Sequence, residues 1–181
     1  MELASPKNLN EIVKESLWKI LEQHAFLFLD PLPEDDIMSY LKQLKVEGNF
    51  QDKDYLCVKM NFECNNREGS FFLYMSADSA IEIETNLLGN DIDQIDLVQC
   101  IREGDGAKEI LNIMGANILT EIYGEEPKRN LSIPESIEVN FTEVIKQIQD
   151  YKKNSQKDTE KFLTVMLTNQ FPIILQLIFY R

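Results

Sequence analysis

The chain aligns with itself when it is shifted by 94 positions. Glu15 then falls on Glu109, and Pro33 falls on Pro127, with the same offset in both cases (109 − 15 = 127 − 33 = 94). In each half, a helical pattern is followed by a proline stop, a connector and two apolar runs typical of a β-hairpin. Two such units share one core when both helices lie on one sheet, so the repeat indicates an ancient duplication.

Local patterns predict where each element lies. The spacing of apolar residues predicts two long amphipathic helices, near 9–28 and 105–123, the first of which should stop at the prolines after Asp30. Runs rich in aromatic and β-branched residues predict two hairpins, 55–62 with 70–75 and 162–168 with 172–180. Weaker signals predict shorter helices near 36–44, 76–89, 92–102 and 143–151, a strand or loop near 137–141, and a solvated loop over 152–161.

The predicted fold class is therefore α+β, with two long helices packed on a mainly antiparallel sheet. A length of 181 residues suits one compact domain, and we expect a single domain over 1–181. Its two pseudo-repeats should cover about 5–89 and 92–181.

Charge and cysteine content restrict the partners and the compartment. The net charge is −13 and the basic residues are scattered, which argues against nucleic acid and against an anionic membrane surface. The longest apolar stretch, near 171–180, is too short for a membrane-spanning helix, and the N-terminus does not have the pattern of a signal peptide. Three cysteines without a CxxC pair favour reduced, buried thiols, so we expect a cytoplasmic protein.

A single histidine narrows the chemistry. It excludes histidine-rich metal sites and nucleophiles activated by a histidine base, and we expect no metal site in this chain. The 94-residue offset places His24 opposite Ile118, on the apolar face of its helix, so His24 is predicted to be buried. Any catalysis must use carboxylates, amides or groups of a partner.

One helix presents such groups together. At about 100° per residue, the residues Asp105, Glu109, Asn112, Ala116 and Thr120 share one face of the helix 105–123. The opposite face is predicted to be core and carries Ile110, Leu111, Met114, Ile118 and Ile122. Asp105 is suited to capping the helix start, and the small side chains of Ala116 and Thr120 leave room for a partner. Taken alone, a glutamate and an asparagine one turn apart are usually ordinary solvated surface.

The wider spacing resembles a known signature. Asp105-x3-Glu109-x2-Asn112, followed by Pro134 after 22 positions (134 − 112 = 22), is similar to the motif of the CheC/CheX/FliY family. Members of that family are phosphatases of chemotaxis response regulators. The closer likeness is to CheX, through the run 109–117 and through the presence of one intact motif.

The resemblance implies a mechanism and a partner. Asn112 would orient the water that attacks the aspartyl phosphate of a CheY-like receiver domain, and Glu109 would pair with a receiver lysine. Asp105, Ala116 and Thr120 would lie in the partner-binding surface. The chain would need no cofactor of its own, because the receiver binds the Mg²⁺.

The first half departs from the motif, and other functions remain open. Trp18 occupies the position equivalent to Asn112, so Glu15 has no amide partner; we expect the indole to be partly buried rather than an exposed anchor. One alternative function is a non-catalytic receiver-binding module in a flagellar or signalling assembly, and another is a structural duplication without a receiver partner. The resemblance also implies a homodimer joined through an edge strand, for which 173–178 is a candidate that could equally be central.

Overall fold

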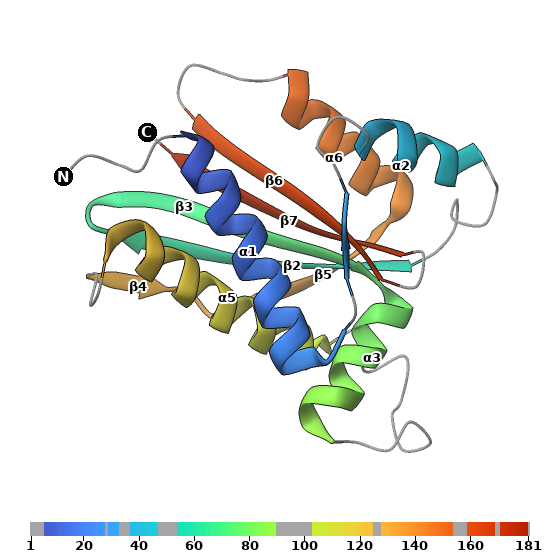
Figure 1. Ribbon diagram of the computed structural model, residues 1–181, viewed down its shortest axis with the longest axis horizontal. Helices are drawn as coiled ribbons and strands as arrows, with labels where there is room; N and C mark the ends of the chain where they lie inside the picture. The colour runs from blue at the N-terminus through green and yellow to red at the C-terminus, as the bar shows by residue number, and fades with distance from the viewer. Residues whose placement is uncertain are drawn as a thin grey trace.

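The structure is a computed structural model that describes residues 6–27, 29–32, 37–46, 54–89, 103–124, 128–153, 159–168 and 171–180 (Figure 1). The helices in these ranges are α1 (Pro6–Ala25), α2 (Ile37–Val46), α3 (Ala77–Leu88), α5 (Asp105–Tyr123) and α6 (Phe141–Lys153). The strands are β1 (Asp30–Pro31), β2 (Asp54–Cys64), β3 (Arg67–Ser76), β4 (Arg129–Leu131), β5 (Glu135–Asn140), β6 (Thr159–Thr168) and β7 (Phe171–Tyr180).

The strands form one seven-stranded antiparallel sheet in the order β1-β6-β7-β3-β2-β4. Both predicted hairpins are confirmed, β2 with β3 and β6 with β7, and they join through the pairing of β3 with β7. Strand β7 is therefore central, so the run 173–178 is not an edge of the sheet. The edge of β2 that does not pair with β3 pairs with two strands: β5 pairs with the first half of β2, and β4 pairs with the last residues of β2.

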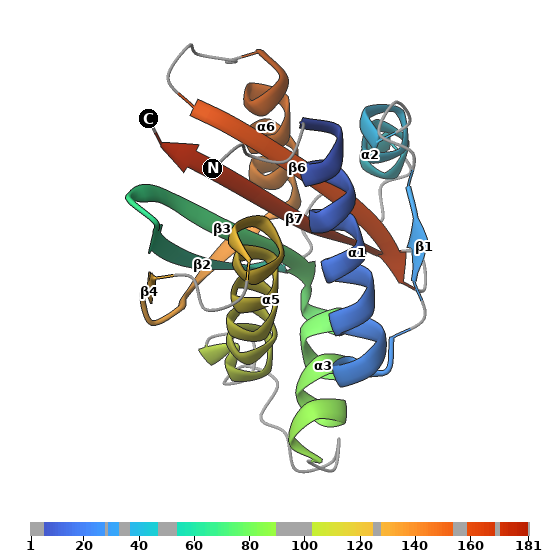
Figure 2. The same ribbon diagram turned by 60° about the vertical axis from the view of Figure 1, so that its left-hand side comes forward.

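Helices cover both faces of this sheet. The long helices α1 and α5 lie side by side on one face, with α3 next to them, and α2 and α6 lie on the other (Figures 1 and 2). Side chains alternate along the strands accordingly: Leu56 and Val58 enter the core under α1 and α5, whereas Tyr55 and Cys57 enter the core under α2 and α6. The α+β class and the placement of two long helices on a mainly antiparallel sheet are confirmed.

Helix α3 begins and ends where its sequence predicts. Ser76 is the N-cap, and its hydroxyl accepts a hydrogen bond from the Ser79 N–H at 3.1 Å. Gly89 ends the helix in the left-handed conformation, with φ +65°. A short predicted strand and two short predicted helices are also present as β5, α2 and α6, while the helix predicted near 92–102 lies outside the described residues.

The first long helix ends earlier than the prolines suggest. Its last residue is Ala25, because Phe26 adopts a left-handed conformation with φ +54° and the Leu27 N–H turns back to the Leu21 carbonyl. The prediction that His24 is buried is wrong: in the last turn, Leu21 and Ala25 carry the contact with the core, and His24 is exposed. The solvated loop was also predicted too long, since β6 already begins at Thr159.

The described cysteines are buried free thiols, Cys57 under α6 and Cys64 under α5, as the sequence predicts; Cys100 lies outside the described residues. None of the helices in the described ranges is long and apolar enough to cross a membrane. Within the same ranges, no three His, Cys, Asp or Glu residues come together in a group that could hold a metal ion.

Candidate functional site

The start of α5 is fixed by a neighbouring helix. The Gly106 N–H donates to the Glu84 carboxylate of α3 at 2.6 Å, and this carboxylate occupies the place of a side-chain cap. A glycine is needed here, because a Cβ at position 106 would lie 2.7 Å from Glu84 Oε2 and 3.1 Å from Glu84 Cα. The N-cap residue is Gly104, with φ +59° and no side-chain cap.

Asp105 therefore does not cap the helix, contrary to the sequence-based prediction. It is the first residue of α5, and its carboxylate pairs with Lys108 at 3.2 Å on the exposed side of the first turn. A side chain caps a helix from the N-cap position, which Gly104 occupies here. One of the free N–H groups of the first turn, that of Gly106, is already bound by Glu84. Asp105 remains on the exposed face with Glu109.

The central part of α5 presents the predicted pair of side chains. Glu109 is exposed and Asn112 is partly buried, one turn apart on the outer side of the helix. Ile110 and Leu111, on the inner side, are fully buried against the sheet. Within the described residues, neither Glu109 nor Asn112 makes a hydrogen bond or an ion pair. A carboxylate and a carboxamide are thus available to a partner on a helix whose other side is anchored.

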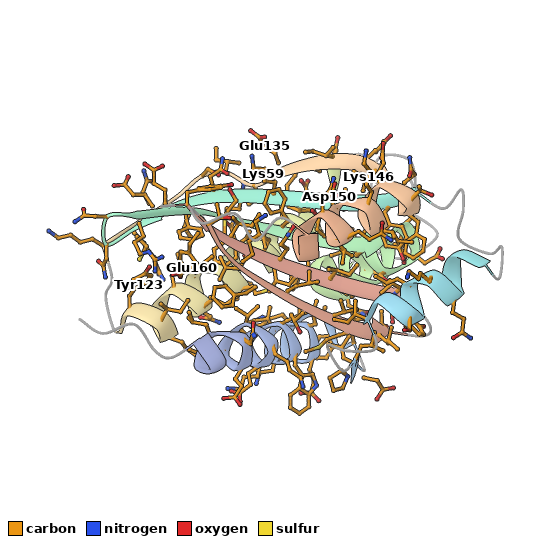
Figure 3. All side chains as sticks on the ribbon, turned by 90° about the horizontal axis from the view of Figure 1, so that it is seen from above. Lys59, Tyr123, Glu135, Lys146, Asp150 and Glu160 are labelled. Atoms are coloured by element: carbon orange, nitrogen blue, oxygen red, sulfur yellow. The ribbon has the colours of Figure 1, made fainter. Side chains whose placement is uncertain are left out.

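The anchoring is tight in the middle of the helix and at its end. At Gly115 the helix comes so close to the sheet that a Cβ would lie 2.3 Å from Met60 Cε. At the last residue, Tyr123 is buried beside Glu160 of β6 (Figure 3), and burial raises the pKa of its hydroxyl. Glu160 binds Arg67 of β3 at 3.1 Å, which links the two hairpins under this end of α5. Such support fixes the backbone of α5, from which the Glu109 and Asn112 side chains extend.

The space beside the small residues of α5 is filled by a side chain that the motif does not include. Arg129 of β4 donates from Nη1 to the Ala116 carbonyl at 2.9 Å and to Thr120 Oγ1 at 3.0 Å. Thr120 Oγ1 also donates to the Ala116 carbonyl at 2.8 Å. Ala116 and Thr120 do leave room on this face, and in this chain Arg129 occupies it. Its guanidinium remains exposed.

Pro134, the last residue of the motif, follows α5 in the chain and lies between β4 and β5. It is buried in the connection between β4 and β5, where the chain moves from one half of β2 to the other. Ser132 holds the connection against β2: its N–H donates to the Asn61 carbonyl, and its Oγ accepts from the Asn61 N–H. The proline thus belongs to the bend that places β4, and with it Arg129.

The equivalent position on α1 looks different. Trp18 is 47% exposed, so about half of the indole is buried, as predicted, and the other half faces solvent. It lines a groove of about 380 Å³ with Leu29, Pro31 and Met166, and Glu15 pairs with Lys19 at 3.9 Å. This surface has no carboxamide next to its glutamate, so it does not reproduce the chemistry available at Asn112.

Several solved structures share this arrangement. CheX from Vibrio vulnificus superposes with a TM-score of 0.61 at 13% identity, covering 94% of this chain and 95% of that one. CheX from Desulfovibrio desulfuricans gives 0.60 at 11% identity, with 94% and 97% covered. CheX from Borrelia burgdorferi, solved as a CheX–CheY–BeF3–Mg²⁺ complex, gives 0.56 at 13% identity, with 94% and 97% covered.

This chain has the CheC/CheX-like fold. The match extends over nearly the whole length of both partners, so it includes both helix and hairpin units. This fold is the one that the resemblance to the CheC/CheX/FliY family implies. No family model matches the sequence, and no curated protein matches it either. At this level of identity the CheX-like fold rests on three-dimensional structure.

Proposed function

We propose that this chain is a phosphatase of a chemotaxis response regulator, acting on the aspartyl phosphate of a CheY-like receiver domain. The observation that carries the proposal is the pair Glu109 and Asn112. They lie one turn apart on the outer side of a tightly anchored helix, and neither has a partner among the described residues.

The reaction asks little covalent chemistry of this chain. Water attacks the phosphorus, the bond between phosphorus and the aspartate oxygen breaks, and the products are a free carboxylate and inorganic phosphate. Catalysis then consists of placing the water in line and stabilising charge, and the receiver supplies the Mg²⁺ that neutralises the phosphoryl oxygens. A side-chain amide can hold a water through hydrogen bonds, and Asn112 has an amide that no described residue uses.

Glu109 has a different role in this proposal. Its carboxylate is exposed and precedes Asn112 by three residues, so it reaches the rim of any site that Asn112 enters. An ion pair with the receiver lysine would fix the register of α5 on the receiver. The structural similarity to a CheX that was solved together with CheY, BeF3 and Mg²⁺ supports a receiver as the partner.

The surface could also dock on a receiver without hydrolysing its phosphate, and a turnover measurement separates the two functions. A CheY-like receiver is phosphorylated with a small-molecule phosphodonor, the donor is removed, and the decay of the phosphoprotein is followed with this protein present at roughly one part in fifty. We expect each molecule of this protein to clear many receivers. Decay that stays at the spontaneous rate, despite binding, would favour the non-catalytic module.

A further inference from the structure

We propose that Arg129 is a docking residue for an acidic side chain on the receiver, close to its phosphorylation site. This inference rests on the proposed function, because it names a further contact of the same helix surface. It concerns a residue outside the motif that defines the surface.

Arg129 is held in place on the face of α5. Its backbone is fixed by the pairing of β4 with the end of β2, opposite Cys64. Its side chain is fixed by hydrogen bonds to the Ala116 carbonyl and to Thr120 Oγ1, both from the same nitrogen, Nη1. A guanidinium has five N–H donors, and among the described residues Nε and Nη2 of Arg129 have no acceptor. A fixed, exposed cation with unused donors costs little side-chain entropy when it binds.

The position of Arg129 relative to Asn112 follows from helix geometry. Ala116 and Thr120 follow Asn112 by four and eight residues, so the guanidinium lies about 6 to 12 Å further along the helix axis. Glu109 lies on the other side of Asn112, towards the start of the helix. The surface therefore has an anionic group before the amide and a cationic group after it.

This polarity matches the chemistry of a receiver site. Such a site combines a lysine with the carboxylates that bind Mg²⁺, since Mg²⁺ prefers oxygen ligands of this kind. When Glu109 faces the lysine, Arg129 would face the receiver on the other side of Asn112, where an acidic side chain would complement its charge. With the helix reversed, like charges would meet, so the pair Glu109 and Arg129 would determine the direction in which α5 docks. An arginine is suited to this contact because its planar fork can bind a carboxylate with two parallel hydrogen bonds.

A purely structural role for Arg129, tying β4 to α5, predicts different measurements. Removing the side chain would then lower the melting temperature and leave receiver affinity unchanged at temperatures where the protein is folded. A docking role predicts weaker affinity in the folded protein, and a loss that salt screens. Affinity and melting temperature must therefore be measured on the same variants.

The experiment compares Arg129→Ala, Arg129→Lys and Lys128→Ala for binding to a CheY-like receiver loaded with beryllofluoride and Mg²⁺. Lys128→Ala is the matched control, because it removes an exposed cation from the neighbouring position. At low salt we expect Arg129→Ala to weaken binding roughly tenfold, Arg129→Lys to recover only part of the affinity because an ammonium lacks the planar fork, and Lys128→Ala to stay within about twofold of wild type. At high salt the difference between Arg129→Ala and wild type should shrink.

The outcomes separate this inference from the proposed function. If wild type binds the loaded receiver and Arg129→Ala binds equally well, the docking role of Arg129 is wrong and the proposed function stands. If Lys128→Ala weakens binding as much as Arg129→Ala, a general charge effect replaces the specific contact. If wild type binds no loaded receiver, both proposals fail.

Discussion

Replacing Gly115 with alanine should destabilise the protein by about 1 kcal/mol, although alanine is the better helix former. The reason is the close approach of α5 to the sheet. A Cβ at position 115 would lie 2.3 Å from Met60 Cε and 3.2 Å from Phe71 Cε2, and both of these side chains are fully buried. Carbon atoms in contact prefer about 3.5 to 4.0 Å, so the Met60 methyl group would have to move by more than about 1 Å.

Two opposing effects set the magnitude. Alanine in place of glycine inside a helix contributes about 1 kcal/mol of stability, whereas inserting a methyl group into a packed core costs about 1 to 3 kcal/mol. The net loss should therefore be about 1 kcal/mol. Because Gly115 is three residues after Asn112, displacement of the helix should also lower the rate of receiver dephosphorylation.

A double-mutant cycle isolates the contact. Met60→Ala removes the atom in the way, so Gly115→Ala in that background should stabilise the protein by up to about 1 kcal/mol, which makes the coupling energy about 2 kcal/mol. Asn117→Ala is the control for helix propensity, because Asn117 is exposed on the same helix; it should stabilise by roughly 0.5 kcal/mol. Urea unfolding followed by far-ultraviolet circular dichroism measures the free energies of the four proteins in the cycle and of the control. Equal effects of Gly115→Ala in the two backgrounds would refute the tight contact.

Three further predictions concern the docking carboxylate, the unmatched half of the repeat and a buried thiol. Glu109→Ala should weaken binding to a beryllofluoride-loaded receiver as well as lower the hydrolysis rate, and added salt should mimic part of the loss in titrations of the wild type; undiminished affinity would contradict its docking role. Trp18→Asn should not create a second active site, because Glu15 is paired with Lys19 and the larger, exposed Glu22 stands on α1 where α5 has Ala116; a clear gain in phosphatase rate would contradict this. Burial raises the pKa of Cys57 from 9.0 to about 12, so in a Cys100→Ser background iodoacetamide at about pH 8 should label Cys57 only after unfolding. The same shift means that the thiol ionises at lower pH in the unfolded protein than in the folded one, so the free energy of unfolding should fall between about pH 9 and pH 12. Rapid labelling of Cys57 in the native protein would contradict both the slow labelling and this pH dependence.

Local sequence patterns were sufficient for most of the elements. The Ser76 and Gly89 caps of α3 use interactions within a few residues, and both hairpins have the short apolar strands and polar turns that pair with their neighbours. The face shared by Glu109 and Asn112 follows from helix periodicity alone. Each of these features depends on residues that are close in the chain.

The errors arose where distant residues decide the structure. The start of α5 is held by Glu84, 22 residues before Gly106, so the local prediction that Asp105 is the cap was wrong. Arg129 reaches Ala116 across 13 residues from a strand of only three residues, and no periodic pattern marks such a contact. His24 follows the apolar spacing of α1 yet is exposed, because the helix ends one residue later and Phe26 turns the chain away.

The most direct test of the proposed function is the single-turnover decay of a phosphorylated receiver across a range of concentrations of wild type and of Asn112→Ala. The concentration dependence separates the maximal rate from the half-saturating concentration. If Asn112 orients the attacking water, the maximal rate should fall by at least roughly a hundredfold in the variant, while the half-saturating concentration should stay within a few-fold of wild type. The variant should fold normally, since Asn112 lies outside the buried face of α5. Wild-type decay in Asn112→Ala would contradict the proposed catalytic role.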